Sequence, residues 1–171
     1  ALHNGDVAGK GVPAALYMAY VSGMLVEIVP RASSARTILE RANGSLHPIM
    51  EPGMFVTAFA MLIDPARHHF EIACAGHNPA LTKLADGTVA DLAMAPGLPL
   101  GLGAHADIGT AAVDLARGDL LAVFTDGIDE AKNIDGDEFG RWRIHDVAAR
   151  SAGAIDVARR LQSAVNHHSA G

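Results

Sequence analysis

Two short acidic turns are the stretches of this sequence best suited to chemistry. Asp6 lies in GDVAGKG, after a lead-in that we expect to end a strand, and Asp126 lies in FTDGIDEA, at the end of the apolar strand LLAVFT. Such a carboxylate can point at one place together with backbone oxygens, and Mg²⁺ and Mn²⁺ prefer oxygen ligands. Two such ions can clamp a phosphoryl group and lower the pKa of a bound water. Taken alone, each aspartate is more typical of a plain turn, because turns favour Asp and Gly.

The glycines around Lys10 do not form a nucleotide-binding loop. A P-loop needs four residues between its glycines and Ser or Thr after the lysine, whereas three residues separate Gly5 from Gly9 and Gly11 follows Lys10. The dinucleotide fingerprint also fails, because no parallel strand–helix–strand unit surrounds the turn. A metal site and a plain turn are the two interpretations left open.

Other reactive side chains are weaker candidates. In CAGHNPAL, His77-Asn78-Pro79 forms a turn between strands, and a Cys74–His77 nucleophile pair is an alternative that no sign of a lowered thiol pKa supports. The nine histidines show no zinc-binding spacing, and the G-x-S-x-G nucleophile elbow does not occur. The single cysteine excludes an intrachain disulfide and a thiolate zinc cluster, which favours a cytosolic setting.

Charge and hydropathy exclude two classes of partner. The net charge is −6 and the basic residues are scattered, which argues against nucleic acid, since phosphate binding requires clustered Lys and Arg. Residues 11–26 carry no charge, but a membrane span needs about 20 apolar residues, and Pro13 and Gly23 interrupt this run. We expect a buried core helix here and no membrane contact for this domain. A longer parent protein could still be anchored through another domain.

The patterns that position these turns come in blocks. A helix is predicted from Pro13 to about Ile28, where Pro30 stops it, and a second follows a cap at Ser33 or Ser34. The next segments predict, in order, strands in MFVTAFAMLID and HHFEIACAG, a hairpin in PALTKLADGTVADL, two strands in ADIGTAAVDLARGDLLAVFTDG, and helices in EFGRWRIHDVAARS and AIDVARRLQSAVNHH. Segregated helices and strands indicate an α+β fold with helices on mostly antiparallel sheet.

The motifs, taken in order, resemble those of the bacterial SpoIIE-type serine phosphatases. This branch belongs to the metal-dependent protein phosphatase superfamily, which is protein phosphatase 2C-like. The matching motifs span roughly residues 5 to 140 and are GDVAGKGVPAAL, FVTAFAMLID, CAGHNPAL, PGLPLGL, GDLLAVFTDGIDEAKN and GDEFG. The resemblance implies an α/β/β/α sandwich, with two antiparallel sheets flanked by helices. We therefore expect residues 1–171 to form a single phosphatase-like domain.

The resemblance also implies the chemistry of the two turns. It makes Asp6 a catalytic residue that bridges two Mg²⁺ or Mn²⁺ ions, with the Val7 carbonyl as a further ligand, and it makes Asp126 another catalytic metal ligand. A metal-activated water would attack phosphoserine or phosphothreonine on a regulatory partner, for example an anti-sigma-factor antagonist, in the cytoplasm. Lys10, His77 and Asn78 are weak candidates for substrate binding, without a defined role.

The sequence departs from the family pattern at both ends. The family carries a Gly-Gly-Asp-type motif upstream and an Asp-Asp motif downstream, and neither occurs here, so we expect an incomplete domain whose flanking strands are missing. Unpaired sheet edges would then favour a homodimer. The alternative function is a catalytically incomplete binding or regulatory module. The acids near Asp126 are expected to be solvated loop residues, namely Asp129, Glu130, Asp135 and Asp137.

Overall fold

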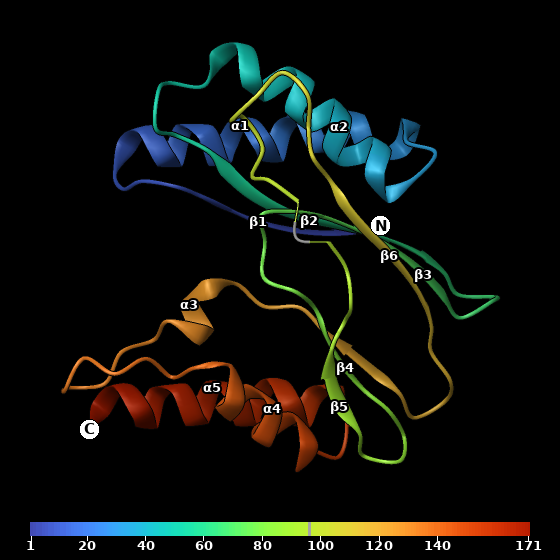
Figure 1. Ribbon diagram of the computed structural model, residues 1–171, viewed down its shortest axis with the longest axis vertical. Coiled ribbons are helices and arrows are strands. Elements are labelled where there is room, and N and C mark those ends of the chain that lie inside the picture. The colour runs from blue at the N-terminus through green and yellow to red at the C-terminus, as the bar shows by residue number, and fades with distance from the viewer. Residues whose placement is uncertain (96) are drawn as a thin grey trace. The chain divides into compact units, whose positions relative to one another are not determined.

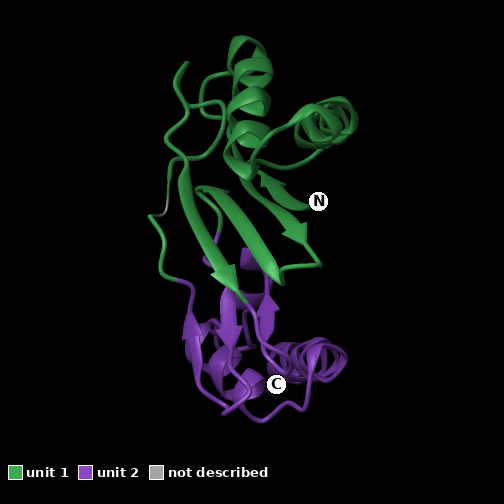
Figure 2. Cartoon of the chain, turned by 90° about the vertical axis from the view of Figure 1, so that its right-hand side faces the viewer, with its two compact units in different colours: residues 1–77, 93–114 green, residues 78–92, 115–171 purple. Residues whose placement is uncertain are grey.

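The computed structural model describes residues 1–95 and 97–171, which divide into two compact units (Figure 2). Unit 1 comprises residues 1–77 and 93–114, and unit 2 comprises residues 78–92 and 115–171. Pro96, which opens the PGLPLGL motif, lies outside the described residues. Each unit has its own sheet, helices and apolar core. That the chain forms a single phosphatase-like domain stays a prediction.

Unit 1 is built on a four-stranded antiparallel sheet in the order β1-β2-β3-β6. Its strands are β1 (Leu2–Val7), β2 (Val56–Asp64), β3 (His69–Ala75) and β6 (Gly109–Asp114). The predicted β2–β3 hairpin is confirmed, and its turn begins where Asp64 Oδ1 accepts the backbone N–H of Ala66 at 3.0 Å. The β1–β2 register places Asp6 opposite Thr57, and it therefore determines which side chains surround the first acidic turn.

Two helices pack on this sheet (Figure 1). The helical elements of unit 1 are α1 (Val12–Ile28), the 3₁₀ turn η1 (Val29–Arg31), α2 (Ala35–Leu46) and the 3₁₀ turn η2 (His47–Ile49). The predicted cap of α2 is confirmed at Ser34, whose Oγ accepts the backbone N–H of Thr37 at 3.0 Å. The buried face of α2 follows the predicted helical spacing and consists of Ala35, Ile38, Leu39, Ala42, Asn43 and Leu46.

The prediction that α1 is a buried core helix is wrong. Val21, Leu25 and Ile28 are buried, but Val12 and Val26 are 71% and 72% exposed. The helix lies at the surface of unit 1 and presents only one side to the core, so its apolar residues continue around its exposed side. In the described part of the chain, one helical stretch, Val12–Arg31, is long and apolar enough to cross a membrane. Core helices of soluble proteins and signal sequences can have the same length and composition.

Unit 2 is built on a three-stranded antiparallel sheet in the order β5-β4-β7. Its elements are β4 (Leu81–Lys83), β5 (Val89–Asp91), β7 (Leu120–Ala122), α3 (Asp126–Asp129), α4 (Arg141–Ala149) and α5 (Ala154–Ala170). The predicted β4–β5 hairpin is confirmed, and Asp86 Oδ1 accepts the Thr88 N–H at 2.8 Å in its turn. The core of this unit consists of Leu81, Phe124, Phe139, Ile144, Ala148, Val157 and Leu161.

The two strands predicted in residues 106–127 are present and join different sheets, since β6 pairs with β3 and β7 pairs with β4. One detail of the second strand differs from the prediction. The last strand ends at Ala122, so Asp126 does not end a strand; it begins helix α3. An acidic residue is favourable there because it complements the positive end of the helix dipole. The α+β class, with two antiparallel sheets and flanking helices, is confirmed.

Candidate functional site

Asp6 lies near the end of β1, with its backbone fixed by the sheet and its side chain exposed. Its neighbour Val7 is buried, as expected for successive residues of a strand, which face opposite sides. Thr57 Oγ1, on the paired strand, lies 3.5 Å from the Asp6 carbonyl oxygen. In the part of the chain that the structure describes, the Asp6 carboxylate forms no hydrogen bond or ion pair. The carboxylate is therefore available to an external ligand.

His77 is brought beside the same strand from the end of β3. It is buried, its Nδ1 lies 3.5 Å from Thr57 Oγ1, and its ring centroid lies 6.2 Å from that of Phe59. Thr57 thus stands between His77 and the backbone of Asp6. No motif in the sequence marks Thr57 as a site residue. Its one signal is that it is a polar residue near the start of the apolar strand FVTAFAMLID.

The glycines of GDVAGKG form a turn between β1 and α1. Gly9 and Gly11 have φ angles of 105° and 79°, a conformation that residues with a Cβ adopt rarely. The turn is fixed at its start, where the Ala8 N–H donates to the Phe55 carbonyl at 2.9 Å. Lys10 is exposed between the two glycines, and its ammonium group forms no hydrogen bond or ion pair within residues 1–95 and 97–171. A role for Lys10 in substrate binding stays a prediction.

Asp126 is the first residue of α3 in unit 2 and is partly buried. Its carbonyl accepts the Glu130 N–H at 2.8 Å, while its carboxylate has no partner among the described residues. Asp135 and Asp137 are exposed in the following loop, as predicted, and their backbone N–H groups donate to Asn133 Oδ1 at 3.0 and 2.8 Å. Glu130 is exposed after α3, whereas Asp129 is partly buried and is the last residue of the helix, so the prediction of a solvated loop residue is wrong for Asp129.

The predicted site residues are divided between the two units. Asp6, Val7 and His77 lie in unit 1, whereas Asn78 and Asp126 belong to unit 2. Over the described residues, no group of three or more His, Cys, Asp or Glu side chains could hold a metal ion. The Asp6 and Asp126 carboxylates and the Val7 carbonyl nevertheless fit Mg²⁺ or Mn²⁺ in donor type, since both ions take oxygen ligands. A joint metal site stays a prediction.

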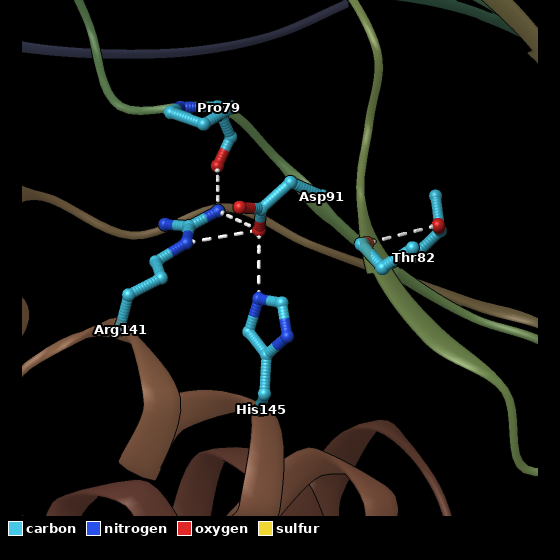
Figure 3. A network of polar contacts seen from close by, with 6 residues as sticks. Pro79, Thr82, Asp91, Arg141 and His145 are labelled. Carbon is cyan, nitrogen blue, oxygen red and sulfur yellow. Dashed lines mark hydrogen bonds and ion pairs between the residues drawn. The ribbon is translucent and has the colours of Figure 1, made fainter.

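A polar network in unit 2 was not predicted (Figure 3). Arg141 Nε and Nη2 donate to Asp91 Oδ1 at 2.9 and 2.5 Å, and His145 Nε2 lies 2.8 Å from the same oxygen. Burial raises the pKa of Asp91, but hydrogen bonds from Arg141 and His145 outweigh this effect and lower the pKa below its usual value. Asp91 and Arg141 are 50 residues apart, so no local sequence pattern pointed to their contact.

Cys74 is not arranged as a nucleophile. Its Sγ donates to the backbone carbonyl of His77 at 3.1 Å, so the hydrogen bond does not involve the imidazole. Burial raises the pKa of the thiol more than the contact with the His77 backbone lowers it. A thiol with a raised pKa is poorly nucleophilic at neutral pH. The alternative of a Cys74–His77 nucleophile pair is therefore wrong.

The chain matches one family over its whole length and one characterised relative over most of it. The family model for stage II sporulation protein E (SpoIIE) matches residues 1–171. The phosphoserine phosphatase RsbU of Bacillus subtilis (strain 168) is 31% identical to this chain over 132 residues, which are 77% of this chain and 39% of RsbU. The chain thus spans about two fifths of the length of this relative.

Solved structures share the fold at low sequence identity. The phosphatase domain of SpoIIE from Bacillus subtilis, with a fragment of its regulatory domain, matches with a TM-score of 0.81 and 20% identity, over 99% of this chain and 50% of that chain. RsbX in complex with magnesium matches with a TM-score of 0.65 and 14% identity, over 94% of this chain and 71% of that chain. At these identities the likeness shows the fold alone.

Proposed function

The chain belongs to the family of stage II sporulation protein E (SpoIIE), and we propose that it is part of a metal-dependent protein serine/threonine phosphatase. The observation that carries the proposal is the family match over residues 1–171, which includes an exposed Asp6 whose carboxylate has no partner in the described chain. The relative RsbU, a phosphoserine phosphatase, supports the reaction class. The magnesium complex of RsbX supports a divalent ion as cofactor.

The residues proposed to hold the ions are Asp6 and Asp126, through their carboxylates, and Val7, through its carbonyl. Bound Mg²⁺ or Mn²⁺ would supply a Lewis acid and a water of lowered pKa. The protein's own contribution is to fix the ligands. Pairing of β1 with β2 holds the Asp6 backbone, with Thr57 Oγ1 close to its carbonyl oxygen. Lys10, exposed at the tip of the turn, offers a positive charge to a phosphate group.

The proposed substrate is a phosphoserine or phosphothreonine on a regulatory partner protein, such as an anti-sigma-factor antagonist, in the cytoplasm. A second candidate function is a phosphatase-like binding or regulatory module with little activity. The observation that favours it is that the described residues contain no group of three or more metal-binding side chains. Both candidates bind a regulatory partner protein. They differ in whether the phosphate is removed.

Turnover of a phosphoserine protein with Mn²⁺ distinguishes the two candidates. We expect Asp6→Asn and Asp126→Asn each to reduce the rate by roughly two orders of magnitude, as loss of an electrostatic stabiliser does in other active sites. Asp135→Asn is the matched control, because Asp135 is an exposed acid in the loop that follows α3. Turnover that neither Asp6→Asn nor Asp126→Asn affects would overturn the metal mechanism. No turnover, together with tight binding of a regulatory protein, would support the binding module.

A further inference from the structure

The helix that carries Asp126 is too short to be stable by itself. Helix α3 has four residues, Asp126–Asp129. Isolated helices shorter than about 12 residues are marginal in water, because nucleation fixes several backbone angles for one hydrogen bond. The position of Asp126 must therefore be set by what packs around this segment. Residues 139 and 140, just before α4, and Arg141, its first residue, contact the segment on both sides of Asp126.

The residues after Asp126 are held by two backbone hydrogen bonds. The Gly140 N–H donates to the Asp129 carbonyl, and the Phe139 N–H donates to the Ala131 carbonyl, each at 2.8 Å. These bonds satisfy carbonyl groups at and beyond the end of α3, where a helix has no internal donors. Residues 139 and 140 thereby fix the end of the Asp126 segment.

The residues before Asp126 are held by the side chain of Arg141. Its guanidinium carbon lies 4.6 Å from the centroid of the Phe124 ring, and Phe124 is buried two residues before Asp126. A cation over an aromatic face is attracted to it, most strongly where water is excluded. Arg141 therefore covers the side chain of Phe124, which lies just before the start of α3.

The guanidinium is itself fixed by groups from two further segments (Figure 3). Besides its two bonds to Asp91 Oδ1 on β5, Arg141 Nη2 donates to the Pro79 carbonyl at 2.6 Å. The planar guanidinium has its donors in a fixed geometry, so these bonds determine its orientation as well as its place. His145, one turn further along α4, has its Nε2 2.8 Å from the same oxygen of Asp91.

We infer that Arg141 is a positioning residue for Asp126, acting through the Phe124 ring, and that Asp91 is its anchor. This inference rests on the proposed function, in which Asp126 is a metal ligand. Arg141 would hold the Phe124–Asp129 segment in place before a metal binds. Loss of Arg141 would then weaken metal binding without removing any metal ligand.

Direct measurement of Mn²⁺ binding by electron paramagnetic resonance tests this role. We expect Arg141→Gln to weaken Mn²⁺ affinity by about tenfold, the lower end of the loss typical for residues that orient metal ligands. Turnover of the variant should recover at saturating Mn²⁺. Arg141→Lys should restore the affinity only in part, because lysine keeps the charge but not the planar donors. The control is Arg150→Gln, which removes an exposed arginine paired with Asp146 at 2.8 Å and should leave Mn²⁺ affinity unchanged.

Two further measurements separate this inference from the proposed function. If Asp126→Asn weakens Mn²⁺ binding and Arg141→Gln does not, the inference is overturned and the proposed function stands. If Asp126→Asn has no effect on Mn²⁺ binding, the metal role of Asp126 fails, and amide hydrogen exchange without metal tests Arg141 alone. Arg141→Gln should then speed exchange in residues 124–131, and unchanged exchange would overturn the inference. If Arg141→Gln does not fold, Asp91→Ala removes the oxygen to which Arg141 donates and should weaken Mn²⁺ binding likewise, whereas unchanged affinity would overturn the inference.

Discussion

Asp91 shows how single hydrogen bonds determine the protonation of one side chain. Removal from water favours the neutral carboxylic acid, whereas donors favour the carboxylate. Two donors from Arg141 and one ring nitrogen of His145 meet at Oδ1, and together they outweigh the effect of burial. The charged form of Asp91 is therefore part of the folded structure.

The lowered pKa of Asp91 predicts a pH-dependent contribution to stability. The folded-state pKa lies below the ordinary value of 3.8, so ionised Asp91 stabilises the fold above that value, and the contribution is lost as the pH falls through the folded-state pKa. We expect Asp91→Asn to lower the urea unfolding midpoint at pH 7 and the difference from the natural protein to close in acid. The effect should be modest, because the side chain is 40% exposed and solvent screens it.

A control variant and the result at low pH show whether the charge of Asp91 or its packing stabilises the fold. Asp135→Asn is the control, because it removes an exposed acid whose carboxylate has no partner among the described residues, and it should leave the midpoint at pH 7 unchanged. A stability difference for Asp91→Asn that persists unchanged at the lowest pH would show that packing, and not the charge of Asp91, is responsible.

At the level of elements, α2 is the helix that local sequence signals specify most completely. Helix α2 has a capping serine, an apolar face at helical spacing and a sheet to pack on. The Ser34 side chain accepts a backbone N–H that the helix itself cannot satisfy. Helix α1 starts without a side-chain cap and relies on Pro13 near its first turn.

Removal of the α2 cap should destabilise unit 1. We expect Ser34→Ala to lower the free energy of unfolding by about 1 kcal/mol, the typical loss for an N-cap serine. Ser45→Ala is the matched control, because Ser45 is an exposed residue inside the same helix, and alanine has the higher helix propensity there. Urea unfolding followed by circular dichroism measures both variants. Equal stability of Ser34→Ala and the natural protein would contradict the assignment of the cap.

Local sequence patterns predicted which helices and strands form better than they predicted what packs around each of them. Proline positions, the Ser34 cap and the Asp86-Gly87 turn are local signals, and they identified α1, α2 and the β4–β5 hairpin. The exposure of Val12 and Val26 depends on how much of α1 the sheet covers, which no local pattern states. Nor could spacing show that β6 and β7 join different sheets, or that Asp126 begins a helix held by residues 139–141. At the candidate site, Asp6 was predicted from its motif, whereas Thr57 and Arg141 emerge only from strand register and tertiary contacts.

At the level of the whole molecule, the exposed sheet edges determine the tendency to associate. In the described part of the chain, β1 and β6 end the order of the unit 1 sheet, so each leaves one row of backbone groups without a strand partner. Such edges invite pairing with another chain, and charged residues on them oppose it. The predicted homodimer would form in this way.

Light scattering coupled to size exclusion tests this association. We expect the chain of residues 1–171 to form dimers, and Leu2→Lys, at an exposed position of β1, to shift it toward monomers. Ile134→Lys is the matched control, because Ile134 is 78% exposed in a loop, outside any sheet. A monodisperse monomer for the unsubstituted chain would contradict the prediction. Association that Leu2→Lys leaves unchanged would assign it to a surface other than β1.

The division of the chain between the units affects the order in which it can fold during synthesis. The chain passes from one unit to the other after residues 77, 92 and 114. The β4–β5 hairpin is therefore made before β7, its other partner, and two strands alone are marginal in water. Unit 1 completes its sheet only when β6 has emerged, and unit 2 follows it. No single cut of the chain separates the units, so either one can be produced alone only by joining two distant stretches through a new linker.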